Sequence, residues 1–132
     1  MSLTTKFEIG LRGVAREKVS EKNTAIAYGS GSISVFATPA MIGLMEKAAL
    51  SSVDPLLPEG HSTVGIKVDV EHLAATPTGG FVEARSELLE IDGRRLIFKV
   101  EAFDSKDMVG RGRHERFIVA TEKFLKKVQE RS

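Results

Sequence analysis

The stretch that decides the fold is residues 35–49, VFATPAMIGLMEKAA. Thr38 is a favourable N-cap, and Pro39 suits the first helical position, where a missing N–H costs nothing. Apolar side chains then recur at helical spacing, at positions 41, 44, 45, 48 and 49. The pattern predicts a largely enclosed helix from Pro39 to about Val53, with one acid, Glu46, at the border of its apolar surface.

Length and composition narrow the class of protein. The 132 residues suit one domain, and 19 basic against 18 acidic side chains leave a net charge of only +1. So small a charge creates no field that would favour nucleic acid or a membrane surface. The absence of cysteine excludes disulfides, thiolate metal sites and a cysteine nucleophile, and is compatible with a reducing cytosol. We therefore expect a single domain over residues 1–132, cytoplasmic, with no nucleic-acid or membrane partner.

Strand patterns follow the helix. In residues 61–73 the valines and the isoleucine at positions 64, 66, 68 and 70 predict one apolar face, and His72 continues its phase. Residues 81–91 and 95–104 flank Asp92-Gly93, a strong hairpin signal. A last strand over residues 108–119 contains two glycines, at 110 and 112, which would let a helix, another backbone or a ligand come close. Residues 121–131 resemble a short amphipathic helix.

The segments ahead of the long helix are predicted less sharply. Residues 6–12 and 14–19 alternate weakly, and residues 24–28 and 33–36 resemble short strands. One long helix followed by strands at hairpin spacing predicts an α+β domain, in which a curved antiparallel sheet wraps around a central helix. Such a sheet leaves edge strands exposed, and pairing of edges between two copies is a common remedy, so we expect a homodimer at least.

Several reaction classes find no support. The chain has no Walker loop, no G-x-S-x-G elbow and no H-E-x-x-H pair, so neither a metal site nor an NTPase or serine hydrolase is expected. Glu46 could be a solvated acid beside Lys47, or a carboxylate acting as general base or nucleophile. Thr38 could simply cap the helix, or could lie at an oxyanion site near its N-terminus. His72 could be a satisfied core histidine or part of a site near Glu46.

The remaining histidines and the arginines of the last strand carry weaker signals. His61 begins a strand at a loop edge, and His114 lies in the charged run of residues 111–116. The arginines at positions 111, 113 and 116 form a cationic cluster, which is either a solvated face or a site that holds phosphates of a ligand.

Three motifs together resemble a known family. They are A-T-P-A-x-x-x-L-M-E on the helix, V-G-I-K-V-D-V-E-H-L-A-A-T-P on the long strand and V-G-x-G-x-H-x-R-F on the last strand. In this combination the chain resembles the hot-dog-fold thioesterases related to fluoroacetyl-coenzyme A thioesterase, from about Ile33 to Phe117. The resemblance implies a hot-dog fold. It also implies a catalytic triad of Thr38, Glu46 and His72.

The same resemblance implies further properties of the site. The family's substrate-contacting glycine and arginine would match Gly65 and Arg116. Coenzyme A would be part of the substrate, and no separate cofactor is implied. The family's aromatic gate ahead of the helix has no matching pair in residues 28–33, YGSGSI, which favours a short or medium acyl-CoA in general over fluoroacetyl-CoA.

The sequence therefore predicts an acyl-CoA thioesterase, whose thioester enters at a dimer interface beside the central helix. A non-hydrolytic acyl-CoA binding module on the same fold is the alternative. A hot-dog hydratase or dehydratase ranks lower, because it would pair a histidine with an acid such as Asp69 or Glu71. Those acids face away from His72 in a regular strand.

Overall fold

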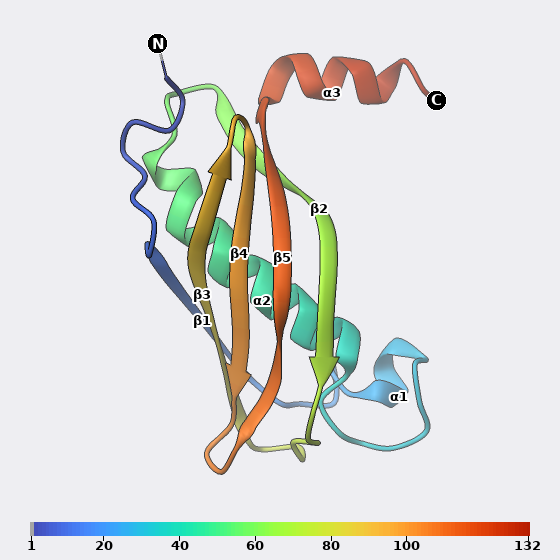
Figure 1. Cartoon of the computed structure of the whole chain (residues 1–132). Coiled ribbons are helices and arrows are strands. Elements are labelled where there is room, and N and C mark those ends of the chain that lie inside the picture. Colours follow the sequence, from blue (N-terminus) through green and yellow to red (C-terminus); the bar gives the residue numbers. More distant parts are fainter. Residues whose placement is uncertain (1) are drawn as a thin grey trace.

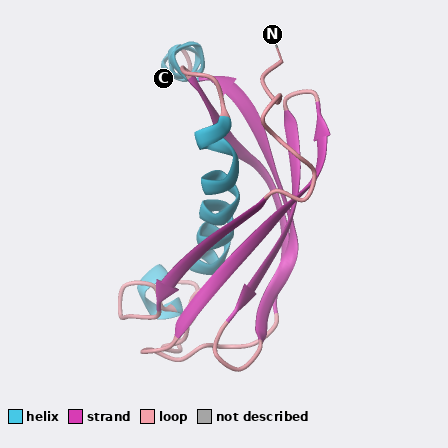
Figure 2. Ribbon diagram, turned by 90° about the vertical axis from the view of Figure 1, so that its left-hand side faces the viewer, coloured by secondary structure: helices cyan, strands magenta, loops and turns pink. Residues whose placement is uncertain are grey.

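A curved five-stranded sheet holds the long helix α2 (Thr38–Val53) against one of its faces (Figures 1 and 2). The computed structural model describes residues 2–132. All neighbouring strands are antiparallel, in the order β1-β3-β4-β5-β2, so β1 and β2 form the two edges. The elements are β1 (Arg12–Lys18), α1 (Ala25–Tyr28), α2 (Thr38–Val53), η1 (Asp54–Leu56), β2 (His61–His72), β3 (Phe81–Asp92), β4 (Arg95–Phe103), β5 (Met108–Ala120) and α3 (Thr121–Gln129).

The predicted α+β architecture and the central helix are confirmed. The buried side of α2 faces the concave side of the sheet, where each enclosed Leu, Met or Phe side chain contributes roughly 1.5–3 kcal/mol of transfer free energy. The buried residues of α2 are Ala40, Met41, Leu44, Met45, Ala48, Ala49, Ser52 and Val53. The predicted Asp92-Gly93 hairpin is also present between β3 and β4, with Gly93 at a φ of 61°.

The two glycines of β5 do what their spacing predicts. A Cβ on Gly110 would collide with Met41 of α2, and a Cβ on Gly112 would collide with the backbone of β2. Their absent side chains therefore let the helix and the edge strand pack closely against β5. In Figure 1 the helix α3 leaves the end of β5 and extends beyond the β2 edge of the sheet.

Two expectations ahead of α2 were wrong. Residues 25–28 form the short helix α1 with Thr24 as its N-cap, because the threonine hydroxyl accepts the N–H of Ala27 at 3.3 Å. Residues 33–36 form only isolated bridges, in which Val35 pairs with Pro77 and Phe36 with Thr24. Short segments of mixed propensity take the conformation that their long-range partners impose.

The predicted strand 61–73 exists, but the prediction of one apolar face along it was wrong. The register against β5 shifts between Gly65 and Lys67, which inserts one extra residue, Ile66, into the edge strand. Val64 is paired with Phe117, and Val68 with His114, residues that β5 presents on opposite faces. The bulge thus turns the second half of β2, and His72 with it, toward the helix.

Candidate active site

The N-terminus of α2 brings Thr38 and His72 together. Ala37 is the N-cap residue and makes no side-chain capping bond, so the expectation that Thr38 caps the helix was wrong. Thr38 is already the first helical residue, and its Oγ1 lies 2.8 Å from Nδ1 of His72. Its hydroxyl is therefore available to orient the imidazole.

The other ring nitrogen of His72, Nε2, faces the interior of the protein. Nε2 is buried and has no hydrogen-bond partner among the described residues. Burial lowers the pKa of His72 below its ordinary value, against a smaller opposing effect of the Ala74 backbone, so the neutral ring is favoured. Thr38 and His72 line a pocket of about 430 Å³ together with Phe36 and Leu73. A half-buried neutral imidazole that lines a pocket is suited to proton exchange or hydrogen bonding with a bound ligand.

Glu46 lies further along α2, opposite Gly65 of β2. Its side chain is 40% exposed, and Oε2 lies 3.9 Å from Nη1 of Arg116. A Cβ built on Gly65 would come within 2.7 Å of the same oxygen. The missing side chain of Gly65 therefore makes room for the carboxylate beside the edge strand.

Arg116 is held from two sides inside the sheet. The residue is 4% exposed, its Nε donates to Thr63 Oγ1 at 2.7 Å, and Nη2 donates to Thr63 O at 3.0 Å. Thr63 in turn donates its hydroxyl to Oδ1 of Asp54 at 2.6 Å. Burial lowers the pKa of Arg116, while the charges of Asp54 and Glu46 oppose that effect. The guanidinium stays charged, since arginine has so high an intrinsic pKa.

His114 is the site residue that the sequence argument underrated. The residue is 1% exposed, its Nδ1 lies 2.8 Å from Lys67 O, and its Nε2 lies 3.1 Å from Nη1 of Arg116. A carbonyl oxygen can only accept, so Nδ1 must carry the proton of the neutral ring. Nε2 is then unprotonated and accepts the hydrogen bond from Arg116. Burial lowers the pKa of His114, and the positive charge of Arg116 lowers it further. The signal was present in the H-x-R spacing, which puts both side chains on one face of a strand.

The expected cluster of three arginines does not form. The pleat directs Arg116 inward, whereas Arg111 lies on the other face, with its Nε 3.8 Å from Glu71 Oε1. Arg113 is exposed and is paired with Asp69 in the register of the two strands.

The five residues proposed from the sequence thus form two groups. One consists of Thr38 and His72, and the other of Glu46, Gly65 and Arg116, to which the structure adds His114. Thr38 and Glu46 are eight helical residues apart, which is about 12 Å along the axis of α2. No hydrogen bond or ion pair joins the two groups within residues 2–132.

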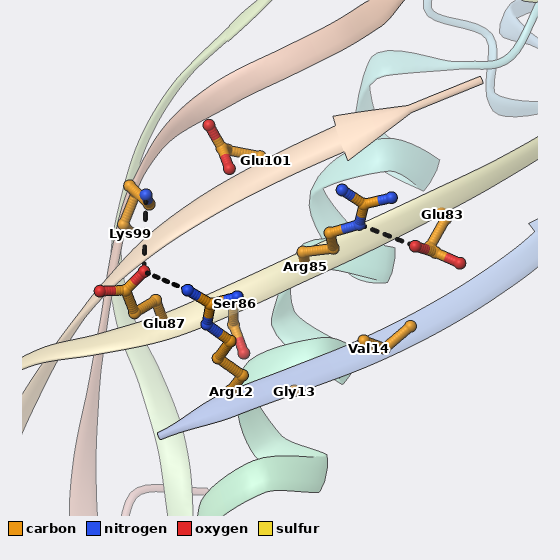
Figure 3. A pocket seen from close by; sticks show the side chains of 9 residues that line it. All are labelled: Arg12, Gly13, Val14, Glu83, Arg85, Ser86, Glu87, Lys99 and Glu101. Carbon is orange, nitrogen blue, oxygen red and sulfur yellow. Dashed lines mark hydrogen bonds and ion pairs between the residues drawn. The ribbon is translucent and has the colours of Figure 1, made fainter. Parts of the chain in front are cut away.

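A second hollow, on the outer face of β1, β3 and β4, has different chemistry (Figure 3). Its charges pair with each other, since Glu87 lies 3.5 Å from Lys99 and 4.0 Å from Arg12. Arg85 is paired with Glu83 at 2.7 Å. A surface that neutralises its own charges offers little to a charged ligand, so this hollow is not a candidate site.

Residues 19–122 match the family described as fluoroacetyl-CoA-specific thioesterase. The chain belongs to this family. The fluoroacetyl-CoA thioesterase of Streptantibioticus cattleyicolor is 43% identical over 98 residues, which are 74% of this chain and 70% of that protein. A solved structure of fluoroacetyl-CoA thioesterase has a TM-score of 0.90 at 36% identity, covering 96% of this chain and 98% of the other.

More distant solved structures share the fold of this chain. A hot-dog-like protein from Thermanaerovibrio acidaminovorans has a TM-score of 0.90 at 29% identity, covering 99% of this chain and 97% of that one. A thioesterase superfamily member from Thermus thermophilus has a TM-score of 0.85 at 28% identity, with 94% of each chain covered. The hot-dog fold expected from the motifs is confirmed.

Two further observations concern metals and membranes. Within residues 2–132, no group of three histidine or acidic side chains lies close enough together to hold a metal ion. None of the helices in the same range is both long and apolar enough to cross a membrane.

Proposed function

We propose that this chain hydrolyses the thioester of a short or medium acyl-CoA. The observation that carries the proposal is the Thr38–His72 bond of 2.8 Å beside a pocket that both residues line, in a chain of a thioesterase family. A member of the family has been solved as a variant in complex with fluoroacetate and CoA. The same class of substrate, an acyl group carried on CoA, is the one we assign here.

Glu46 and His72 would share the proton transfers. Glu46 either attacks the thioester carbonyl or takes a proton from the water that does. When Thr38 donates its hydroxyl hydrogen bond to Nδ1 of His72, Nε2 carries the imidazole proton and can donate a hydrogen bond to the departing sulfur. With Glu46 as general base, the proton that it takes from water passes on to the CoA thiolate. With Glu46 as nucleophile, water cleaves the mixed anhydride, which frees Glu46 and supplies the proton of the thiol. The products are the free acid and CoA.

We propose that a second copy of the chain completes the site. Residues 65–69 of the edge strand β2 are all exposed, including Ile66 at 51% and Val68 at 39%, and their backbone edge is unpaired. A two-fold antiparallel pairing centred on residue 67 would place residue 72 of one copy opposite residue 62 of the other. His72 would then lie three strand positions from Gly65 of the other copy, about 10 Å, instead of seven positions, about 23 Å, within its own strand.

A complementation assay tests both proposals together. Thiol release from a panel of acyl-CoAs should be rapid for the wild type, and should fall by orders of magnitude in Glu46→Gln and in His72→Ala. If the site is shared between copies, mixing the two inactive variants should restore about a quarter of wild-type activity, since half the dimers are mixed and each has one intact site. Mixtures without activity would contradict the shared site.

The same assay separates hydrolysis from binding alone. A non-hydrolytic binding module would bind acyl-CoA, as measured by calorimetry, and release no thiol. Near-normal hydrolysis in both single variants would refute the roles of Glu46 and His72, whatever the oligomeric state. Light scattering of the wild type measures that state independently.

A further inference from the structure

His114 is the buried titratable group that the proposed mechanism does not use. Both ring nitrogens are engaged, Nδ1 by the carbonyl of Lys67 and Nε2 by Nη1 of Arg116. Its ring stacks on Phe98, with 6.3 Å between centroids and 27° between planes. The bond to β2 determines the tautomer, and the stacking determines the ring plane, so the lone pair of Nε2 has one direction.

The lone pair of His114 Nε2 accepts one of the hydrogen bonds that fix the guanidinium of Arg116. A guanidinium has five N–H groups in one plane, and three of them have acceptors here. Thr63 takes two, one on Nε and one on Nη2, and His114 takes the third, on Nη1. Asp54 anchors Thr63 by accepting its hydroxyl at 2.6 Å and its backbone N–H at 3.2 Å. Arg116 is therefore clamped at both ends of its plane.

The Nη1 end of Arg116 lies beside Glu46 and Gly65, where the proposed reaction would take place. Nη1 lies 3.9 Å from Oε2 of Glu46, and 3.4 Å from the point where a Cβ of Gly65 would be. Cε1 of His114 lies 3.2 Å from the same point. A small rotation of the guanidinium would move its charge relative to the Glu46 carboxylate and to any acyl group held beside Gly65.

We propose that His114 is a positioning residue, which holds Nη1 of Arg116 toward Glu46 and the space in front of Gly65. The proposal rests on the acyl-CoA thioesterase function proposed above. The alternative hypothesis is that His114 contributes only to the packing of the core. The two differ in one respect, because positioning needs an acceptor at Nε2 and packing needs only the shape of the ring.

Two substitutions separate acceptor from shape. His114→Phe keeps a ring against Phe98 and removes the acceptor, whereas His114→Gln loses the ring and keeps an amide oxygen at about the reach of Nε2. We expect His114→Phe to lower kcat about 10- to 100-fold with KM changed less than about 3-fold, since a misplacement near 1 Å can cost about 100-fold. His114→Gln should stay within about 3-fold of the wild-type kcat. In an Arg116→Gln background, His114→Phe should add less than about 2-fold, because the two residues act as one unit.

A measurement without turnover keeps the clamp testable by itself. The Nη1–H protons of Arg116, which His114 holds, should give resolved, slowly exchanging ¹⁵N–¹H resonances in the wild type and in His114→Gln, and broadened or rapidly exchanging ones in His114→Phe. If the wild type releases no thiol but the three proteins show these resonances as expected, the proposed function is refuted and the clamp on Arg116 is supported. The same resonances in all three proteins would overturn the clamp.

The remaining outcomes are also decisive. A wild-type kcat in His114→Phe would overturn the proposal, and so would equal kcat losses in His114→Phe and His114→Gln with intact far-UV circular dichroism. If His114→Phe does not fold, Thr63→Val tests the other end of the clamp. It removes the acceptor of Arg116 Nε, and we expect the same loss in kcat without a matching change in KM; a wild-type kcat there would overturn the proposal.

Discussion

Gly65→Ala tests whether the position of the Glu46 carboxylate governs turnover. The added methyl would lie 2.7 Å from Oε2 of Glu46, whereas ordinary contact begins at 3.4 Å, so one of them must move by about 0.7 Å. The methyl cannot turn away, because His114 lies 3.2 Å from it on the buried side. Glu46 must therefore yield, and its 40% exposed side chain can do so by rotating toward solvent.

The cost of that movement should appear in the rate and not in the stability. A shift approaching 1 Å in a reacting group costs up to about 100-fold, so we expect kcat to fall about 10- to 100-fold. The free energy of unfolding should change by less than about 1 kcal/mol, because alanine is slightly better than glycine in a strand and the displaced carboxylate regains water.

Two measurements check this prediction together. Thiol release from acyl-CoA gives kcat and KM, and urea unfolding gives the free energy. A kcat within about 2-fold of the wild type would refute the reasoning, since it would mean that the carboxylate position is unimportant. A fall in kcat that merely follows a loss of folded protein would also refute it.

Three other substitutions or conditions have expected outcomes. Thr38→Val should lower kcat about 100-fold, by removing the hydroxyl that orients His72, whereas Thr38→Ser should retain most activity; equal rates in the two variants would contradict that role. Burial lowers the pKa of His72 and His114 below the ordinary 6.5, so the unfolded chain binds protons more tightly. The contribution of these two histidines to the free energy of unfolding should therefore be complete above about pH 6.5 and should be lost progressively as the pH falls below that value. In urea titrations at several pH values, His114→Gln should make the free energy of unfolding depend less steeply on pH. Gly43→Ala should raise the free energy of unfolding by about 0.5–1 kcal/mol, because Gly43 is an exposed helical residue whose added Cβ would meet nothing within 4 Å; a destabilised variant would indicate an unseen contact.

The local patterns were sufficient for the framework of the fold. Apolar spacing after Pro39, the Asp92-Gly93 turn and the glycines of the last strand predicted the helix, the hairpin and the close packing correctly. The helix and the hairpin depend on neighbours within a few residues, which is the range over which propensity and periodicity act, whereas the glycines showed where a close contact was possible and not which element makes it. The joint spacing of the three motifs also indicated the family, which the comparisons confirm.

Only the tertiary structure decided how the side chains of the site are used. The bulge at Ile66 is invisible in an alternating pattern, yet it reverses the facing of half a strand and turns His72 toward Thr38. His114 looked like part of a charged run, and its role depends on Lys67 O, which lies 47 residues away in sequence. The sequence by itself determined which elements form and which residue types are at hand. Strand register and burial, which depend on contacts distant in sequence, determined which polar atoms meet; within residues 2–132 they leave two buried side-chain atoms without a partner, Nε2 of His72 and Oγ of Ser86.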